Sequence, residues 1–353
     1  MSLEILVVDD SALMRRVECD IINSDNKFKV TDTCKDGLEA LEKLRTKKYD
    51  GVVLDINMPR MDGLELLQQL QKEKIKANIV MASTLTVEGA DEAIKSLELG
   101  AIDFVTKPSN IIEAKGDAFK KALLDVLYAA TKARVHFKKP LLTPAADKTA
   151  ASSVNRLKKP GQNKIIAIAS STGGPKALQS VIPKIPADID APVVLVQHMP
   201  AGFTSSMAAR LNELSKVQVK EAEDGELLKK GVVYIAPGGK HIVVNKKGAS
   251  HVIGYSDMPP IGGLKPCANI MFDSLGQTGF DEVVCVVLTG MGADGTNGIL
   301  SLGKKKSVHV IAQDESSCIV YGMPRAIYEA GVVDEVVALS KVAETITKNV
   351  GVK

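Results

Sequence analysis

The stretch Ile165–Leu178, IIAIASSTGGPKAL, places an apolar run directly before two serines and a pair of glycines. A short apolar run followed by glycines and a helix-like pattern is typical of a buried parallel strand that turns into a helix. Such a turn can lift a side chain out of the end of a sheet, so either Ser170 or Ser171 could be a nucleophile. The alternative is a purely structural turn in which Thr172 caps the helix.

The same alternation of apolar runs and amphipathic segments continues on both sides of this stretch. The runs expected to form the other strands are EILVVDD, FKVTDTC, YDGVVLDI, NIVMAST and AIDFVTKP before it, and APVVLVQHMP, GVVYIAPG, HIVVNK, EVVCVVLTG and SVHVIAQDE after it. Strands that alternate with helices favour parallel sheets covered by helices on both faces. We also expect an antiparallel hairpin near VYIAPGGKHIVV.

A segment of different composition separates the two series of strands. From about Lys138 to Asn163 the chain is rich in Pro, Ala, Ser and Lys and has no sustained apolar period, which indicates a linker. A chain of 353 residues is also long enough for two domains. The sequence therefore predicts an α/β protein with two doubly wound, mainly parallel sheet domains, over 1–125 and 163–350, joined by a helix end and a flexible basic linker over 126–162.

Composition excludes several classes of protein. The formal net charge of +3 is too small to indicate a nucleic acid partner. The five cysteines are scattered and odd in number, which suggests neither a disulfide framework nor a zinc site. The beginning of the chain, MSLEILVVDDS, has acidic residues where a signal peptide would be apolar, and no later run approaches the length of a membrane span. We expect a soluble cytoplasmic protein without membrane insertion.

Five polar residues are expected to end strands of the first domain. Asp9 and Asp10 end the first strand, and Asp55, Ser83 and Lys107 end the third, fourth and fifth. The carboxyl ends of parallel strands share one crevice in an open sheet, so these side chains can converge. Three carboxylates repel one another unless a cation neutralises them, and oxygen ligands suit Mg²⁺. A lysine beside them favours an incoming phosphoryl group.

The motifs around these residues are specific. The stretches VVDDSALMRR, VVLDINMPRMDGLELL, MAST and GAIDFVTKPS resemble the response-regulator receiver family across residues 1–125. This resemblance implies that Asp55 accepts a phosphoryl group from the phosphohistidine of a chemotaxis histidine kinase. The other roles that it implies are Mg²⁺ binding by Asp9, Asp10 and Asp55, contact with the aspartyl phosphate by Ser83 and Lys107, and a rotamer change of Phe104 on switching.

The second domain contains four histidines, which differ in their predicted positions. His309 falls inside a strand, where packing is expected, and His241 and His251 flank a hairpin-like segment, where exposure is expected. His198 ends an apolar run and could meet Ser170 or Ser171 in a shared crevice. Asp294 also follows a predicted strand, so a nucleophile, a general base and an orienting carboxylate are all present. Backbone N–H groups in the glycine-rich turns could form an oxyanion hole.

A competing interpretation rests on GMGADG at 290–295. This segment matches G-x-G-x-x-G after a strand, with Asp314 near a later strand end, which is the outline of the dinucleotide site of an oxidoreductase. The match is a single hexapeptide late in its domain, and it explains neither Ser171 nor His198.

Larger motifs favour the hydrolase. SSTGGPKAL, VQHMPAGFTSSMAARLN, EAEDGELLKKGVVYIAPGGKH, VVLTGMGADGTNG and IAQDESSCIVYGMPRAI closely resemble the chemotaxis protein-glutamate methylesterase family over residues 163–349. The resemblance implies hydrolysis of glutamate methyl esters on methyl-accepting chemoreceptors, with release of methanol, and deamidation of receptor glutamines, without a cofactor in the esterase domain. The residue roles that it implies are nucleophile for Ser171, base for His198, orienting carboxylate for Asp294 and oxyanion-hole backbone for Thr172 and Met291.

Three features depart from the family pattern. Ala169 and Ser170 stand where Gly-Ala usually precedes the nucleophile, and Lys265 and Asn269 replace the usual Arg and Asp. A lysine run at 304–306 has no functional explanation in the sequence. A second alternative function is a non-catalytic phosphorylation switch that binds receptors without turnover.

Overall fold

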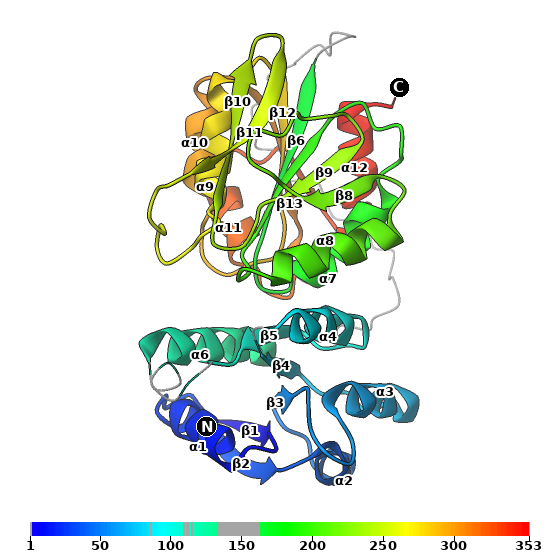
Figure 1. Ribbon diagram of the computed structural model, residues 1–353, viewed down its shortest axis with the longest axis vertical. Helices are drawn as coiled ribbons and strands as arrows, with labels where there is room; N and C mark the ends of the chain where they lie inside the picture. Colours follow the sequence, from blue (N-terminus) through cyan, green and yellow to red (C-terminus); the bar gives the residue numbers. More distant parts are fainter. Residues whose placement is uncertain are drawn as a thin grey trace.

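The computed structural model describes residues 2–84, 86–108, 110, 113, 116–132 and 163–352. Figure 1 shows two α/β domains, with the N-terminal domain in blue and cyan below the C-terminal domain in green to red. Beyond Lys132, the predicted linker over 126–162 lies outside the described residues. No described helix is both long enough and apolar enough to cross a membrane.

The N-terminal domain has a five-stranded sheet in the order β2-β1-β3-β4-β5 in which every pair is parallel. All five strands predicted from the sequence are confirmed. Strands and helices alternate as β1 (Leu3–Val8), α1 (Ala12–Asn23), β2 (Phe28–Cys34), α2 (Gly37–Thr46), β3 (Gly51–Asp55), α3 (Gly63–Glu73), β4 (Ile79–Ser83), α4 (Val87–Glu98), β5 (Asp103–Thr106) and α6 (Asp117–Lys132).

Side-chain caps fix the start of the helices that follow the functional strand ends. Ser11 accepts a hydrogen bond from the N–H of Met14 at the start of α1, and Asp62 forms a capping box with Glu65 at the start of α3. These caps satisfy N–H groups that would otherwise lack partners. Asp9 and Asp10 lie in the short connection between β1 and α1, and Asp55 is the last residue of β3.

The C-terminal domain has a seven-stranded parallel sheet in the order β14-β13-β12-β6-β7-β9-β8, and a separate antiparallel pair, β10-β11. Its strands are β6 (Lys164–Ser170), β7 (Val193–Gln197), β8 (Gln218–Glu221), β9 (Val232–Ile235), β10 (His241–Lys247), β11 (Ser250–Ser256), β12 (Glu282–Val287), β13 (Ser307–Gln313) and β14 (Glu335–Val337). Its helices are α7 (Gly174–Val181), α8 (Phe203–Leu214), α9 (Ala268–Ser274), α10 (Thr296–Gly303), α11 (Met323–Glu329) and α12 (Val342–Val350).

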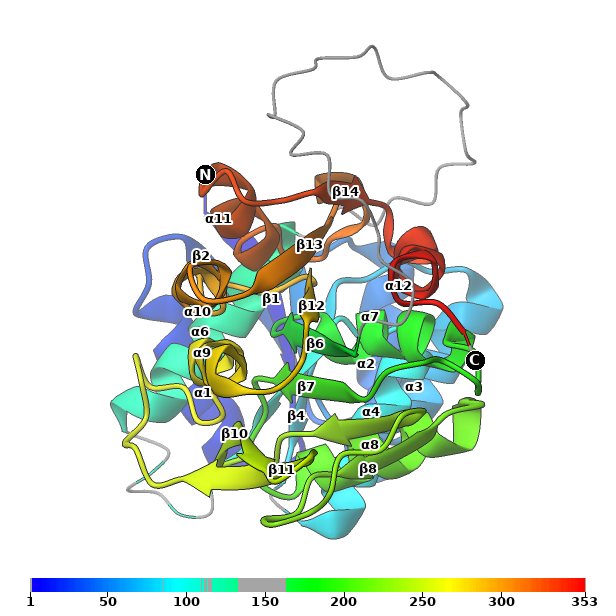
Figure 2. The same ribbon diagram turned by 90° about the horizontal axis from the view of Figure 1, so that it is seen from above.

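Helices cover both faces of this sheet. In Figure 2, α9, α10 and α11 lie on one side of the strands, and α7 and α12 lie on the other. The buried side chains divide in the same way, because α9, α10 and α11 contribute to one apolar cluster and α7, α8 and α12 to another. The central strand β6 is buried along its whole length, so functional groups of this strand can reach solvent only at its end.

The hairpin predicted near 233–244 is wrong. β9 pairs in parallel with β7 and β8, and the antiparallel partner of β10 is β11. The turn between β10 and β11 contains Gly248 at φ +61°, a left-handed conformation that glycine adopts at low cost. β8 and β14, which are short and lack a long apolar run, were not predicted from the sequence. The segment between His241 and His251, expected to be hairpin-like, does contain the turn of the β10–β11 hairpin, although β11 was not predicted as a strand.

The lysine run at 304–306 has a structural role. Lys305 forms an ion pair with Asp273 at 2.8 Å. Lys306 donates hydrogen bonds to the carbonyl oxygens of Thr278 and Phe280 at 2.6 and 2.8 Å. These contacts fasten the end of α10 to the segment before β12.

We expect Gly298→Ala and Gly303→Ala, both in α10, to have opposite effects on stability. A Cβ at Gly298 would lie 2.6 Å from the carbonyl oxygen of Asn269, whereas a Cβ at Gly303 would meet nothing closer than 3.6 Å. Gly298→Ala should therefore lower the unfolding free energy of the domain by about 1–3 kcal/mol. Gly303→Ala should leave it unchanged or raise it by up to about 1 kcal/mol. Thermal unfolding followed by circular dichroism tests both, and equal effects would contradict this packing.

Candidate functional site

Three predicted site residues converge at the carboxyl edge of the C-terminal sheet. Ser171 follows β6, His198 follows the neighbouring β7, and Asp294 lies in the loop after β12, on the other side of β6. His198 Nε2 lies 2.7 Å from Asp294 Oδ2, and the two side chains are only 8% and 5% exposed. Because the three strands are adjacent, this pair lies beside Ser171 at one edge of the sheet.

Asp294 is held by four further hydrogen bonds. The Cys267 thiol donates to Oδ1 at 3.1 Å, and backbone N–H groups of Ala268, Asn269 and Gly295 donate to the two carboxylate oxygens at 2.6–3.0 Å. Burial tends to raise the pKa of Asp294, but the His198 contact and these donors lower it to about 2. Asp294 is therefore ionised at neutral pH and can stabilise a positive charge on His198.

The two adjacent serines have different environments. Ser170 is fully buried, and its hydroxyl donates to Gln197 Oε1 at 2.7 Å. Ser171 is partly exposed and lines a cavity together with His198. Among the described residues, no hydrogen bond links the Ser171 hydroxyl to the His198 ring. Since Asp294 binds Nε2, Nδ1 is the ring nitrogen left for Ser171.

Two backbone N–H groups beside Ser171 remain available as donors. Within the described part of the chain, the N–H groups of Thr172 and Met291 form no hydrogen bond. The loops that carry them are tied together by Thr289, whose hydroxyl bonds the carbonyl oxygens of Thr172 and Val320 at 3.0 and 3.2 Å. Unpaired N–H groups next to a candidate nucleophile are what an oxyanion hole requires.

The other histidines are outside the site, and two of them differ from the sequence expectation. The expected exposure of His241 and His251 is wrong, because both are buried. His241 contacts the carbonyl oxygen of Pro259, whereas His251 accepts a hydrogen bond from the N–H of Gly279 and stacks on Phe280. Burial lowers the pKa of both rings. His309 lies in β13 as predicted, but it is partly exposed and its ring contacts Glu335 at 2.8 Å.

The glycine-rich loop at 290–295 contributes its carboxylate to the Ser-His-Asp group and not to a dinucleotide site. Its carboxylate, Asp294, binds His198, and Asp314 caps its own turn by accepting from the N–H of Ser317. Neither acid is therefore available for a ribose. Asn269 accepts hydrogen bonds from the N–H groups of Gly295 and Gly298, so this departure from the family pattern supports the loop. Lys265 lines the cavity, and its ammonium bonds the carbonyl oxygen of Met258.

The acidic residues of the N-terminal domain also converge. Ligand oxygens of Asp9, Asp10 and Asp55 lie within 4.8 Å of one another, a hard oxygen set that fits Mg²⁺. Lys107 forms ion pairs with Asp9 at 2.5 Å and with Asp55 at 2.7 Å. Burial raises the pKa of Asp55 to about 6, although the Lys107 charge opposes the shift.

Two further buried polar residues of the N-terminal domain are Ser83 and Glu18. The Ser83 hydroxyl donates to the carbonyl oxygen of Gly89 at 2.7 Å and is buried. Glu18, which sequence analysis did not identify, is a fully buried acid on α1, and neither of its carboxyl oxygens has a hydrogen-bond partner. Burial and the nearby Asp9 charge hold the pKa of Glu18 well above its usual range.

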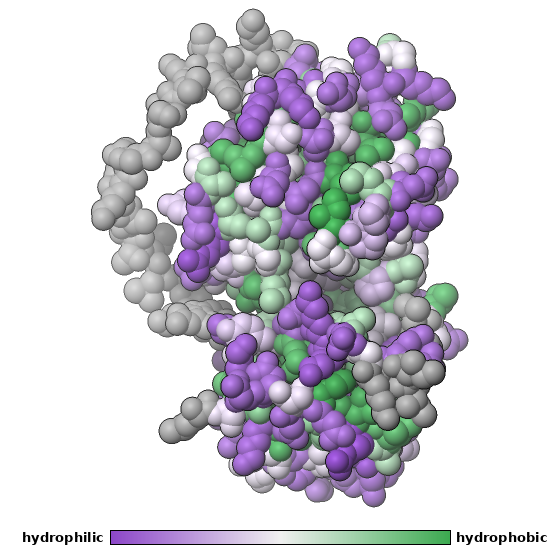
Figure 3. Space-filling view, turned by 90° about the vertical axis from the view of Figure 1, so that its left-hand side faces the viewer, coloured by the Kyte–Doolittle hydropathy of each residue, from purple (hydrophilic) through white to green (hydrophobic). Residues whose placement is uncertain are grey.

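Ser171 and His198 line a cavity at the domain interface, and Lys107, which contacts the acidic cluster, lines the same cavity. It has a volume of about 880 Å³ and is lined by Lys107 and Phe119 from the N-terminal domain and by Ser171, His198 and Lys265 from the C-terminal domain. In Figure 3, a hollow separates the two halves of the molecule on this side.

Direct contacts flank this cavity. Phe104 stacks on Phe203 with ring centroids 4.7 Å apart, and Asp103 Oδ2 accepts the N–H of Gly173 at 3.0 Å. Gly173, at φ +74°, is the N-cap of α7, so Thr172 does not cap this helix as the alternative interpretation proposed. The Asp103 carboxylate therefore lies one residue from the candidate oxyanion hole. In the sequence, Asp103 stands out only as the one polar residue in the apolar run AIDFV.

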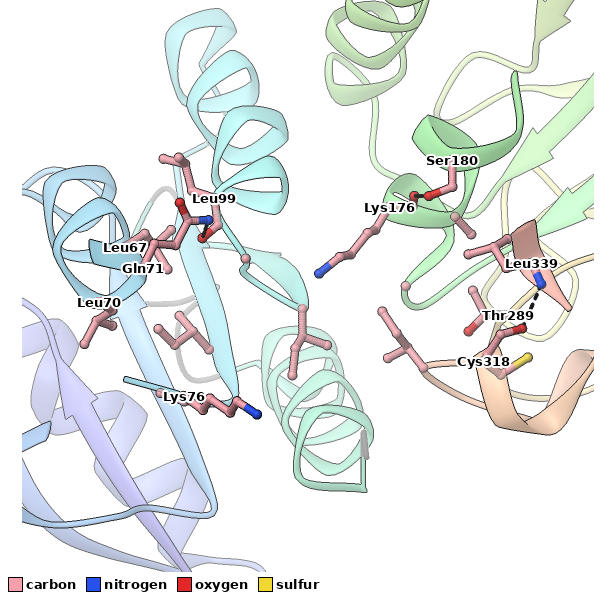
Figure 4. Close-up of a pocket in the computed structure, with 18 of the residues that line it drawn as sticks. Leu67, Leu70, Gln71, Lys76, Leu99, Lys176, Ser180, Thr289, Cys318 and Leu339 are labelled. Atoms are coloured by element: carbon pink, nitrogen blue, oxygen red, sulfur yellow. Dashed lines mark hydrogen bonds between the residues drawn. The ribbon is translucent and has the colours of Figure 1, made fainter. Parts of the chain in front are cut away.

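A second cavity of about 670 Å³ lies elsewhere in the interface. Figure 4 shows Lys176 extending into it from α7, opposite Lys76, Leu67 and Leu99 of the N-terminal domain. Besides these two cavities, the interface contains direct packing of α4 on α8 and α7, and one buried apolar cluster includes residues of both domains.

Comparison with known proteins agrees with both domains. A family model described as CheB methylesterase matches residues 166–346, and one described as response regulator receiver domain matches residues 5–115. Proteins named protein-glutamate methylesterase/protein-glutamine glutaminase from Halalkalibacterium halodurans and Bacillus subtilis are each 42% identical, with 98% of this chain and 98% of the relative covered. The crystal structure of the Thermotoga maritima CheB methylesterase catalytic domain superposes with a TM-score of 0.52 and 40% identity, over 53% of this chain and 99% of that one. The chain belongs to the CheB methylesterase family, in the form that carries an N-terminal response regulator receiver domain.

Proposed function

We propose that this chain is a phosphorylation-controlled esterase that hydrolyses glutamate methyl esters on methyl-accepting chemoreceptors and also deamidates receptor glutamines. The observation that carries this proposal is the His198–Asp294 pair at 2.7 Å beside Ser171, next to two unpaired backbone N–H groups. The relatives' names state the same two activities, on glutamate and on glutamine.

Each residue has a distinct role in the reaction. The Ser171 hydroxyl oxygen attacks the ester carbonyl carbon and passes its proton to His198 Nδ1, while Asp294 holds the proton on Nε2. The negative charge on the carbonyl oxygen accepts hydrogen bonds from the N–H groups of Thr172 and Met291. His198 then protonates the leaving methoxide, and methanol departs. Water, deprotonated by His198, then attacks the acyl carbon, the bond to Ser171 breaks as His198 returns the proton to the serine oxygen, and a glutamate carboxylate remains on the receptor. With a glutamine substrate, the first leaving group is ammonia.

We expect Ser171→Ala to lower methanol release from methylated receptor membranes about a thousandfold or more, because no other described group replaces the nucleophile. Ser180→Ala, on the following helix α7, is the matched control and should retain full activity, because its hydroxyl only bonds the carbonyl of Lys176. Substantial activity in Ser171→Ala would reject this nucleophile. A wild-type chain that binds receptors but releases no methanol would favour the non-catalytic switch.

We infer that the receiver domain restrains the esterase in the unphosphorylated chain. Phe104, Asp103 and Lys107 lie on or directly after β5, and all three line the cavity that contains Ser171 and His198. A receptor helix is about 10 Å wide and cannot lie over Ser171 while the receiver domain covers it. The two cavities leave part of the interface unpacked, so separation of the domains has to break the packing of α4 on α8 and α7.

Phosphorylation is proposed to release this restraint through Lys107. The Asp55 carboxylate would accept the phosphoryl group from a chemotaxis histidine kinase, with Mg²⁺ held by Asp9, Asp10 and Asp55. A phosphoryl group on Asp55 would attract the Lys107 ammonium and the Ser83 hydroxyl away from their present partners. Lys107 is three residues from Phe104 on the same strand end, so this rearrangement alters the surface that contacts Phe203.

We expect a small phosphodonor such as acetyl phosphate, together with Mg²⁺, to accelerate methanol release by the wild-type chain. Asp55→Asn should remove this acceleration and leave the slow basal rate, because an amide cannot accept the phosphoryl group. EDTA should abolish the acceleration in the same way. Acceleration that persists in Asp55→Asn would show that another residue is the acceptor.

A second regulatory prediction concerns an ion pair across the interface. The Arg210 guanidinium on α8 binds both carboxylate oxygens of Glu98 on α4 at 2.6 and 3.0 Å. Arg210→Ala should raise the unphosphorylated rate by about two- to threefold, the size expected for an exposed pair. Glu213 also forms an ion pair with Arg210, but within α8 and not across the interface. Glu213→Ala should therefore leave the unphosphorylated rate unchanged. An unaltered rate in Arg210→Ala would argue against the restraint.

A further inference from the structure

We propose that Gln197, oriented by Ser170, is a positioning residue that fixes the nucleophile Ser171 and the base His198 relative to each other. This inference rests on the proposed esterase function and extends it to two residues that do not touch the substrate. It also gives the second serine of the SSTGG motif a role of its own.

Gln197 joins the two catalytic strand ends. It is the last residue of β7, and its side chain is almost fully buried. Its amide Nε2 donates to the carbonyl oxygen of Ser171 at 3.0 Å and to that of His198 at 3.0 Å. One side chain thus uses both of its N–H donors to hold the backbone of both residues, which lie on neighbouring strands.

Ser170 determines which way the Gln197 amide points. The fully buried Ser170 hydroxyl donates to Gln197 Oε1 at 2.7 Å, so the oxygen is satisfied and the NH₂ group faces the two carbonyls. In the reversed orientation, the amide oxygen would face two carbonyl oxygens without a donor between them. The buried Ser170 hydroxyl would then also lose its acceptor, which is costly in a water-free site.

The backbone leaves room for this side chain only because residue 174 is glycine. A Cβ at Gly174 would collide with Gln197 Oε1 and would lie 2.9 Å from the Ser170 Cβ. The glycine of the motif therefore provides the space in which the Ser170–Gln197 hydrogen bond forms. Ser170, Gln197 and Gly174, the first residue of α7, therefore depend on one another.

The expected consequence is a change in turnover and not in substrate binding. Displacement of a nucleophile relative to its base reduces the rate of the chemical step, because reacting atoms must be held close and aligned. Gln197 does not contact the substrate in this scheme, so substrate affinity should be preserved.

The test compares Gln197→Met, Ser170→Ala and the double variant in the full chain, activated by acetyl phosphate and Mg²⁺, with methylated receptor membranes as substrate. Gln197→Met keeps the length and apolar stem of the side chain but removes every hydrogen bond. It should lower kcat about ten- to hundredfold with KM unchanged within about twofold. Ser170→Ala should lower kcat about two- to threefold. Because Ser170 acts through Gln197, the double variant should be no slower than Gln197→Met alone.

A second readout does not depend on receptors. The rate at which phenylmethylsulfonyl fluoride modifies Ser171 should fall in parallel with kcat in each variant. Thr278→Val, which removes another buried hydroxyl bonded to a carbonyl oxygen in this domain, is the matched control and should leave both rates unchanged. Where Gln197→Met fails to fold, Ser170→Ala still tests the proposal through kcat and the modification rate.

Three results would overturn the inference: a raised KM with unchanged kcat, losses that multiply in the double variant, or an equal loss in Thr278→Val. Failure of the proposed function gives a different result. A wild-type chain that releases no methanol would reject the esterase, while Ser171 modification by the sulfonyl fluoride would still measure the positioning of Ser171.

Discussion

A parallel strand buried on both faces can present reactive groups only at its ends, and both domains of this protein obey that constraint. The acidic cluster lies at the ends of β1 and β3, with Lys107 after β5, and the Ser-His-Asp group lies at the ends of β6, β7 and β12. Side chains on the connecting loops are held by hydrogen bonds to other loops and to helix starts, as Asp294 is by the N–H groups of Ala268 and Asn269, since packing within the sheet cannot reach them. The functional chemistry therefore depends on which strands are neighbours.

Much of this arrangement could be predicted from the sequence. Asp9, Asp55, Ser171, His198 and Asp294 all directly follow apolar runs or glycine-rich turns, and that position is visible without a structure. The choice between Ser170 and Ser171 could not be made from the residues alone. Two adjacent serines at a strand end have the same local pattern, and only the burial of one and the exposure of the other separates them.

Other features depend on contacts between distant segments. The burial of His251 follows from its stacking on Phe280, and the Cys267 thiol reaches Asp294 across 27 residues of sequence. The hairpin prediction failed for a related reason: the Pro-Gly turn after β9 suggested a tight reversal, but β9 has two parallel partners inside the sheet. Local pattern identified strands, whereas pairing depended on the whole domain.

The orientation of the His198 ring has a consequence for the order of the strands. Asp294 binds Nε2, the nitrogen far from the attachment of the ring, so the proposed reaction assigns the Ser171 proton to Nδ1, the nitrogen close to the histidine backbone. Because Nδ1 lies close to the backbone of His198, it can contact a serine only on an adjacent strand. The strand that precedes Ser171 must therefore be the immediate neighbour of the strand that precedes His198. The N–H of His198 bonds the carbonyl of Ser170 at 3.1 Å, which fixes that adjacency. In the proposed reaction, a strand inserted between β6 and β7 would separate Ser171 from His198 and prevent proton transfer, whereas additions at the outer strands β8 and β14 would leave the pair unchanged. The proposed proton transfer, together with packing, thus restricts which rearrangements of this sheet are compatible with activity.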